Sequence, residues 1–380
     1  PRIERPFGPL GGVVVIATNT WAAFKGKEAL KIEWDKGVNT SYNSEDYMKQ
    51  LTENVHKKGK ELKNKGDIDA AFQNAHKILE TTIQLPHLVH TPMEVPNAVA
   101  WVQNDTCEVW APSQAPQRAR AEVADFLKIP IENVTMNVTF LGGGFGRKSK
   151  PDYVVEAAMV SKAINGPVQV VWSREDDIQH SYFHAVSAQK MKASLDKNGK
   201  VTGWQHRVAL PSISSTFQPG VEYAGGGETA AAVKAPFEIE NFNVEVGKAN
   251  AHVRIGWLRS VINIPLGFSI NVFTDQLAYE AGMDPLDFRM KLIGSDRIEE
   301  TNSEHKMNTA RLKHVLKQAA KNANWGKKLP ERHAQGIAVH YSFLSYVASV
   351  VEVSVKDNNV KVHKIHTVIE EISLFENSAK

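Results

Sequence analysis

A glycine-rich loop is the part of the sequence whose residue types best suit chemistry. It reads Leu141-Gly142-Gly143-Gly144-Phe145-Gly146-Arg147-Lys148. Glycine permits positive φ angles and lets the backbone approach a ligand closely, while the arginine and lysine supply cationic donors suited to phosphate. A strand entering such a loop and a helix leaving it direct backbone N–H groups at an anion. The loop therefore predicts an anion-binding site, with a plain tight turn as the alternative.

The loop does not fit the common nucleotide-binding patterns. A dinucleotide fingerprint that begins at Gly142 requires glycine at position 147, where Arg147 stands. A P-loop ending in Lys148 and Ser149 requires glycine at the same position. Both patterns are excluded, and the class of anion stays open.

Other candidate groups have weaker support. His87 and His90 are three residues apart and His180 and His184 four apart, but neither pair has a carboxylate that completes a zinc-protease pattern. We interpret both pairs as structural histidines and predict no metal-ligating side chains. Cys107 has no evident histidine partner, and no Gly-x-Ser-x-Gly segment occurs, so nucleophilic hydrolysis has no support.

The composition is that of a globular protein of two or three domains. The chain has 380 residues, of which 42% are hydrophobic. Its formal net charge is +3, from 45 basic and 42 acidic residues, so no nucleic-acid partner is expected. The single cysteine excludes an intramolecular disulfide, an iron–sulfur cluster and a cysteine-based zinc site within this chain.

The elements that must position the loop are mixed in type. Residues 133–140 alternate between apolar and polar and predict a half-buried strand entering the loop. A helix is expected over residues 152–164. Further expected elements are strands at 13–16, 30–34, 97–102, 107–111, 168–172, 350–355 and 360–366, and helices at 20–25, 117–127, 268–280, 284–292 and 310–324. A helix is also expected after the cap at residues 43–46, and residues 188–255 are expected to be rich in strands. The order predicts the α+β class with mixed sheets.

The uncharged stretch over residues 6–24 has the length of a membrane-spanning helix. Prolines and glycines interrupt it, so a short buried strand is expected there and no membrane span. The sequence begins without Met and without the charged segment of a signal peptide, so we expect a processed or truncated start.

Several segments together resemble the molybdenum hydroxylases, the xanthine dehydrogenase and aldehyde oxidase family. Residues 140–148 are similar to that family's glycine–phenylalanine loop. The other matching segments are His90-Thr-Pro-Met-Glu94, Trp110-Ala-Pro-Ser-Gln114, Gly256-Trp-Leu-Arg259, Asp275-Gln-Leu-Ala278 and Asp284-Pro-Leu-Asp-Phe-Arg289. The resemblance spans residues 13–369 and is to the molybdenum-binding large subunit, the beta subunit, of the isoquinoline 1-oxidoreductase type.

The resemblance implies an enzyme that binds molybdenum as molybdopterin, in the cytosine dinucleotide form. Such an enzyme hydroxylates an aldehyde or an N-heteroaromatic carbon with oxygen derived from water. By the same resemblance Gln114 and Arg259 are the catalytic side chains: Gln114 hydrogen-bonds an oxygen on molybdenum, and Arg259 stabilises charge on the substrate. The residues expected to bind the cofactor are Gly142, Gly143, Gly144, Phe145, Gly146 and Arg147. A strand-end cap for Gln114 and a salt-bridge partner for Arg259 are the alternatives.

Two departures from the family pattern limit what the resemblance implies. Ser149 stands where xanthine-type members have a glutamate, which argues against xanthine. The family's catalytic base is a glutamate in a Gly-x-Gly-Glu segment near the C-terminus, and we expect this catalytic glutamate to be missing from the 380 residues. We therefore expect a large fragment of an active subunit, with a non-catalytic cofactor-binding or assembly module as the alternative.

The resemblance also implies a domain division and partners. Residues 1–35 are expected to end a small β-rich domain, residues 36–255 to form the first cofactor-binding part, and residues 256–380 a second, incomplete part. This chain lacks the cysteines needed to bind an iron–sulfur cluster, so electrons are expected to pass to a small subunit with [2Fe–2S] clusters. A cytochrome is a further possible acceptor of these electrons. A bacterial source is expected, with the periplasm favoured over the cytoplasm.

Overall fold

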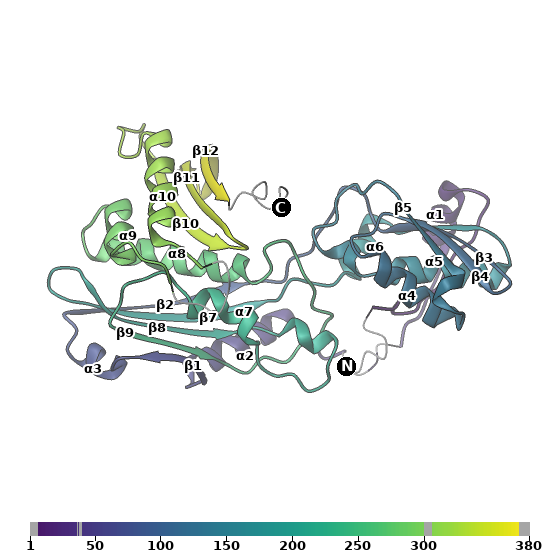
Figure 1. Ribbon diagram of the computed structural model, residues 1–380, viewed down its shortest axis with the longest axis horizontal. Coiled ribbons are helices and arrows are strands. Elements are labelled where there is room, and N and C mark those ends of the chain that lie inside the picture. The colour runs from purple at the N-terminus through teal and green to yellow at the C-terminus, as the bar shows by residue number, and fades with distance from the viewer. Residues whose placement is uncertain (1–6, 36, 38–39, 300–305, 372–380) are drawn as a thin grey trace, which may run out of the picture.

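The structure is a computed structural model that describes residues 7–35, 37, 40–299 and 306–371. Its described strands form three sheets, of four, five and three strands. Figure 1 shows the four-stranded sheet at one end of the longest axis and the other two sheets at the opposite end. Helices and strands are mixed along the whole chain, so the expected α+β class is confirmed.

The four-stranded sheet has the order β5-β4-β3-β6. Its elements are β3 (Asn97–Gln103), β4 (Thr106–Ala111), β5 (Val134–Val138) and β6 (Val168–Val171), with helices α4 (Pro116–Leu127) and α5 (Asp152–Ile164). β4 and β5 pair in parallel, so the chain between them must cross over, and α4 makes that crossover. The two helices bury the core of this sheet, in which Ala100, Val109 and Tyr153 are fully enclosed.

The five-stranded sheet has the order β1-β9-β8-β7-β2. Its strands are β1 (Lys60–Lys65), β2 (Lys77–Leu85), β7 (Ser187–Leu195), β8 (Val201–Ala209) and β9 (Asn241–Val246). Helix α2 (Ser44–His56) packs on it, and α8 (Asn263–Glu280) contributes Leu266, Phe273 and Leu277 to a separate core cluster. The four-stranded sheet is inserted between β2 and β7. The division at residues 35 and 255 stays a prediction.

The three-stranded sheet is an antiparallel meander, in which each strand pairs with the next strand in the sequence. It comprises β10 (His333–Ser342), β11 (Ser345–Lys356) and β12 (Asn359–Glu371), with α9 (Pro285–Ile293) and α10 (Thr309–Ala323) before it. Figure 1 shows α10 lying beside this sheet. The apolar face of α10, which includes Leu312, Val315 and Leu316, packs on the buried side of β11.

The N-terminal segment differs from the prediction. Helix α1 (Thr20–Ala29) is present, but residues 13–16 and 30–34 are not strands, because none of the described sheets pairs with them. Val13, Val14 and Ile16 are each 55% exposed, so they are not the buried strand that their apolar run predicted. No helix among the described residues has the length and apolarity needed to cross a membrane.

A buried histidine network in the five-stranded sheet predicts a pH dependence of stability. His206 Nε2 lies 2.9 Å from Oε1 of Gln189, which also accepts from Ser269. Burial lowers the pKa of His206 from 6.5 to about 3, and burial also lowers the pKa of His90 to about 4. Between these values and 6.5 the unfolded chain binds protons that the folded chain does not. The free energy of unfolding should therefore fall as pH falls from 6.5 to 4, by about 1.4 kcal/mol per pH unit for each such histidine.

Urea unfolding between pH 7 and pH 4 measures this slope. His206→Gln should reduce it by the share of one histidine, because the amide does not titrate. An unchanged slope in a folded His206→Gln variant would contradict the assignment.

Candidate functional site

The glycine loop joins the end of β5 to a short 3₁₀ turn, η2 (Arg147–Ser149), which precedes α5. The strand ends at Val138, two residues before the predicted end, and Phe140 is fully exposed. Gly143 and Gly146 have φ angles of +95° and +102°, and Phe145 has +53°. These values are in the region that glycine adopts without strain, so the two glycines are required by the backbone path.

Three segments far apart in the sequence enclose the loop. A Cβ added at Gly142 would lie 2.6 Å from Cβ of Glu94. A Cβ at Gly144 would overlap the side-chain amide of Gln114, and one at Gly146 would overlap the carbonyl oxygen of Trp257. The glycines therefore allow close packing against residues 94, 114 and 257, which a loop with side chains could not reach.

The loop leaves donors free at its centre. Within the described part of the chain, the backbone amides of Gly143, Gly144 and Phe145 donate no hydrogen bond to protein groups. The flanking amides are occupied, that of Gly142 by Glu94 and that of Gly146 by Gln114. Three consecutive free amides in a loop with αL residues form the kind of concavity that binds anions.

Gln114 follows β4 and is held by the loop on two sides. Its backbone amide donates to the Lys148 carbonyl at 3.0 Å, and its Oε1 accepts from the Gly146 amide at 2.9 Å. The side-chain carbonyl is therefore used, while the NH₂ group has no partner among the described residues. The exposed Gln114 therefore presents its NH₂ group as a free donor.

Arg259 lies at the same place. Its backbone amide donates to the Phe145 carbonyl at 2.9 Å, and its guanidinium lies over the Phe145 ring with 5.2 Å between its Cζ and the ring centroid. Arg259 is exposed and forms no ion pair with any described carboxylate, so the salt-bridge alternative has no partner here. The structure thus brings Gln114, Phe145 and Arg259 together.

Arg147 is the exception among the predicted site residues. Its side chain is 0% exposed and makes two hydrogen bonds to Asp152, at 2.8 and 3.0 Å. The guanidinium also lies 5.0 Å from the centroid of Trp172. The side chain therefore points into the protein and stabilises the start of α5. Its role as a cofactor ligand stays a prediction that this position does not favour.

Glu94 is a residue whose role the sequence reasoning missed. Its Oε2 accepts from the Gly142 amide at 2.9 Å and from Lys148 Nζ at 2.5 Å, so one carboxylate joins both ends of the loop. Partial burial opposes ionisation, but the hydrogen bonds from Lys148 and Gly142 outweigh it and hold the pKa of Glu94 below its usual value. Only its place in the segment 90–94 that resembles the family could have drawn attention to it.

Glu94→Gln should therefore destabilise the protein. The neutral amide leaves the completely buried Lys148 ammonium without a counter-charge, at a cost of about 1–3 kcal/mol. Chemical denaturation at pH 7 measures the loss. The double variant Glu94→Gln, Lys148→Met removes the charge as well and should recover part of it, whereas equal stability of the single variant and the wild type would contradict the ion pair.

Lys150 links the loop to the segment that carries Arg259. Its ammonium is buried, and it lies 3.1 Å from the centroid of the Trp257 ring and 3.1 Å from Ser149 Oγ. Burial and the neighbouring Arg147 lower the pKa of Lys150 to about 7. No carboxylate pairs with it among the described residues, so the ring face is its main electrostatic partner.

One segment has the Gly-x-Gly-Glu sequence of the family's catalytic-base motif, but its glutamate has a structural role. Gly225, Gly226, Gly227 and Glu228 read Gly-x-Gly-Glu, but they begin α7 (Gly226–Val233). The Glu228 carboxylate accepts from the backbone amides of Gly225 and Ile213 and from the Ser212 hydroxyl, at 2.6 to 2.7 Å. Its oxygens are committed to capping the helix, so Glu228 is not a free base.

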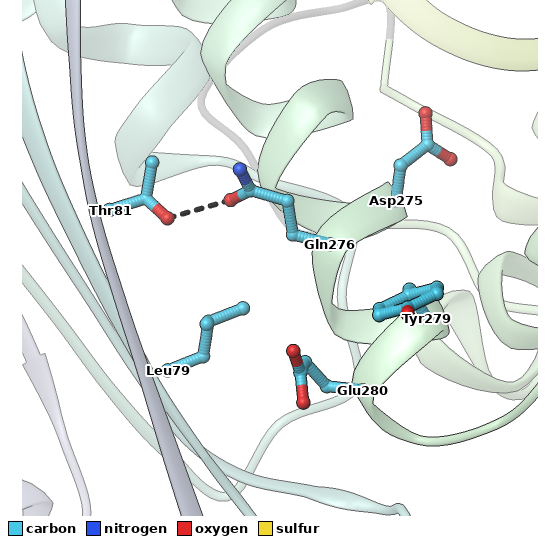
Figure 2. A pocket seen from close by; sticks show the side chains of 6 residues that line it. All are labelled: Leu79, Thr81, Asp275, Gln276, Tyr279 and Glu280. Carbon is cyan, nitrogen blue, oxygen red and sulfur yellow. Dashed lines mark hydrogen bonds between the residues drawn. The ribbon is translucent and has the colours of Figure 1, made fainter.

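A pocket between β2 and α8 contains none of the predicted site residues (Figure 2). Its lining is Leu79, Thr81, Asp275, Gln276, Tyr279 and Glu280. Figure 2 shows Thr81 and Gln276 pointing toward one another, and their side-chain oxygens are 2.7 Å apart. Asp275 is paired with Arg289 and Glu280 with Lys77, so the pocket offers no unpaired charge. No group of three or more His, Cys, Asp or Glu side chains suited to a metal occurs within the described ranges.

The amino-acid sequence of this chain is similar to those of several known proteins. The family model described as the molybdopterin cofactor-binding domain matches residues 49–293. The chain is 29% identical over 349 residues to a membrane-bound aldehyde dehydrogenase [pyrroloquinoline-quinone] of Gluconacetobacter polyoxogenes, covering 86% of this chain and 44% of that protein. It is 25% identical to the isoquinoline 1-oxidoreductase subunit beta of Brevundimonas diminuta, covering 76% of this chain and 39% of that one.

Solved structures show the same fold at lower identity. The aldehyde oxidoreductase of Desulfovibrio gigas superposes with a TM-score of 0.56 at 19% identity, over 79% of this chain and 34% of that one. Quinoline 2-oxidoreductase of Pseudomonas putida 86 gives 0.57 at 18% identity, over 75% and 39%. The chain spans less than half the length of each of these four proteins.

Proposed function

Because the chain belongs to the molybdopterin cofactor-binding domain family, we propose that it is the cofactor-holding part of a molybdenum-dependent oxidoreductase subunit. The observation that carries this proposal is the set of free amides at Gly143, Gly144 and Phe145, with the Gln114 amide and the Arg259 guanidinium beside them.

The donor set fits an anionic pterin cofactor. Molybdopterin carries phosphate, and its dinucleotide forms carry pyrophosphate, which backbone amides and guanidinium groups bind well. The close packing of Gly144 on Gln114 and of Gly146 on Trp257 fixes the path of the loop backbone, and with it the position of the free amides. The negative charge of the nearest carboxylate, Glu94, is balanced by its ion pair with Lys148.

The residues would act by orientation and electrostatics. The bound cofactor supplies oxygen transfer to carbon and accepts two electrons. The NH₂ group of Gln114 would donate a hydrogen bond to the bound cofactor, and the bond from the Gly146 amide to Oε1 sets the orientation of this side chain. Arg259 stabilises negative charge that develops on the substrate, and the Phe145 ring restricts where its guanidinium can lie.

The substrate proposed is an aldehyde or an N-heteroaromatic ring, whose electron-poor carbon gains one oxygen from water while two electrons leave. Ser149, and not a glutamate, stands beside Lys148, which supports this class over xanthine. The cytosine dinucleotide form of the cofactor, an iron–sulfur partner subunit, a further cytochrome and a periplasmic location remain part of the proposal.

A second candidate function, without catalysis, is supported by the position of the Gly-x-Gly-Glu segment. The only Gly-x-Gly-Glu segment in the 380 residues is committed to capping α7, so this chain contributes no base through that motif. A cofactor-binding or assembly module without catalysis is therefore the alternative.

Metal and nucleotide analysis of the complete gene product, made in cells with active molybdenum cofactor biosynthesis, tests the proposal. We expect near-stoichiometric molybdenum, CMP on acid release, and oxidation of an aldehyde or heteroaromatic substrate with an artificial electron acceptor. Molybdenum without oxidation of either class would favour the assembly module. Absence of molybdenum would overturn both functions.

A further inference from the structure

Two buried histidines that the sequence indicated as structural contact the segment that carries Arg259. His90 and His184 are 5% and 2% exposed. His90 Nε2 lies 2.6 Å from the carbonyl oxygen of Trp257, and His184 Nε2 lies 3.0 Å from that of Val261. The two acceptors lie two residues before and two residues after Arg259 in the sequence.

The turn between these carbonyls is strained. Ser260 and Val261 have φ angles of +73° and +47°, although neither is glycine. A β-branched residue with positive φ is rare, and such conformations persist only where surrounding contacts fix them. The local bond from the Val261 amide to the Leu258 carbonyl, at 2.6 Å, closes the turn but does not attach it to the rest of the protein.

We propose that His90 and His184 are positioning residues that clamp the turn over residues 257–261 and hold Arg259 against Phe145. The importance of this clamp for catalysis rests on the proposed function of Arg259. The clamp itself is a property of the folded chain and is tested below without the cofactor.

The chemistry of the two rings suits this role. Burial lowers the pKa of both, that of His90 to about 4, so each imidazole is neutral near pH 7 and carries one proton. A backbone carbonyl can only accept, so the proton is on Nε2 in both rings. Nδ1 of His90 has no partner among the described residues, in agreement with this tautomer.

The His90 contact also reaches the glycine loop. The Trp257 carbonyl oxygen that accepts from His90 occupies the place where a Gly146 side chain would lie. The Arg259 amide in turn donates to the Phe145 carbonyl. Fixing the carbonyl of Trp257 therefore fixes the loop and the arginine segment against one another.

Limited trypsin digestion of the folded 380-residue chain tests the clamp. Arg259 is exposed and trypsin cleaves after arginine, so the rate of cleavage at Arg259–Ser260 reports opening of the turn. His90→Phe and His184→Phe keep an aromatic ring but remove the donor. We expect each to raise this rate about ten-fold, as loss of one buried hydrogen bond implies, with the other sites unchanged.

Gln and Asn variants give the matched controls. Glutamine places its NH₂ near the position of Nε2 and should restore the wild-type rate, whereas asparagine is one atom too short and should not. If a Phe variant does not fold, the Asn variant supplies the measurement. His206→Phe removes a buried donor that contacts Gln189 and none of residues 257–261, so it should leave cleavage after Arg259 unchanged.

An unchanged rate after Arg259 in folded His90 and His184 variants would overturn the clamp, and so would an equal rise at every site. Neither result depends on molybdenum. Loss of the clamp and failure of the proposed function are therefore separate outcomes.

Discussion

Replacing Gly146 by alanine is expected to displace the glycine loop and to abolish retention of the cofactor by the complete protein. The φ angle of +102° is unfavourable for any residue with a Cβ, and the added methyl would overlap the carbonyl of Trp257, which is backbone and is held by His90. Strain of this kind costs about 1–3 kcal/mol before the overlap is counted. The loop must therefore move, and the bond from the Gly146 amide to Gln114 is lost with it.

Gly220→Ala is the matched control for this substitution. Its φ angle is +77°, but no atom lies within 4 Å of an added Cβ. It therefore has the backbone strain without the overlap, and should lose about 1 kcal/mol of unfolding free energy while binding cofactor normally. Comparable losses of stability and of molybdenum content in the two variants would show that the contact with Trp257 does not matter.

Removing Asp152 is expected to cause the largest loss of stability. Its carboxylate receives two hydrogen bonds from Arg147 and lies 3.5 Å from Arg254, and all three side chains are buried. Asp152→Ala leaves two guanidinium groups in the interior without their counter-charge, and breaking a buried pair in this way costs about 3–5 kcal/mol. Urea denaturation at pH 7 measures the difference.

Substitution of the cationic partner, Arg147, tests whether the loss of stability comes from the unpaired buried charges. Arg147→Met should cost less than Asp152→Ala, because Arg254 remains beside the carboxylate. Lys49→Ala removes an exposed pair with Asp46 and should change stability by less than about 1 kcal/mol. If Asp152→Ala were no more harmful than Lys49→Ala, the buried cluster would not be an important source of stability.

Local patterns predicted the elements that depend on nearby residues. Helix α5 covers the expected residues 152–164, and the alternation over residues 133–140 correctly indicated β5. The strand ends early, because the last two residues belong to the exposed loop. The apolar run at residues 13–16 misled the prediction, since a strand requires a partner strand and none of the described ones pairs with it.

The candidate site was predictable in part. The glycine loop is visible in the sequence as three consecutive glycines, of which Gly143 is required by its positive φ angle and Gly142 and Gly144 by close packing against Glu94 and Gln114. The roles of Gln114 and Arg259 came from the resemblance to a family, and those roles stay predictions. Glu94, His90 and His184 carried no signal of their own, because their importance lies in which backbone groups they contact.

The sequence by itself therefore determined the type of site: a loop that admits close approach, cationic residues nearby, and a single cysteine, too few for a cluster. The tertiary structure decided which groups face that site. It turned Arg147 inward to Asp152, left Arg259 exposed beside Phe145, and set His90 and His184 against the carbonyls on either side of it. The physical reason is range: φ preferences act within a few residues, whereas ion pairs and hydrogen bonds join atoms that only the folded chain brings within about 3 Å.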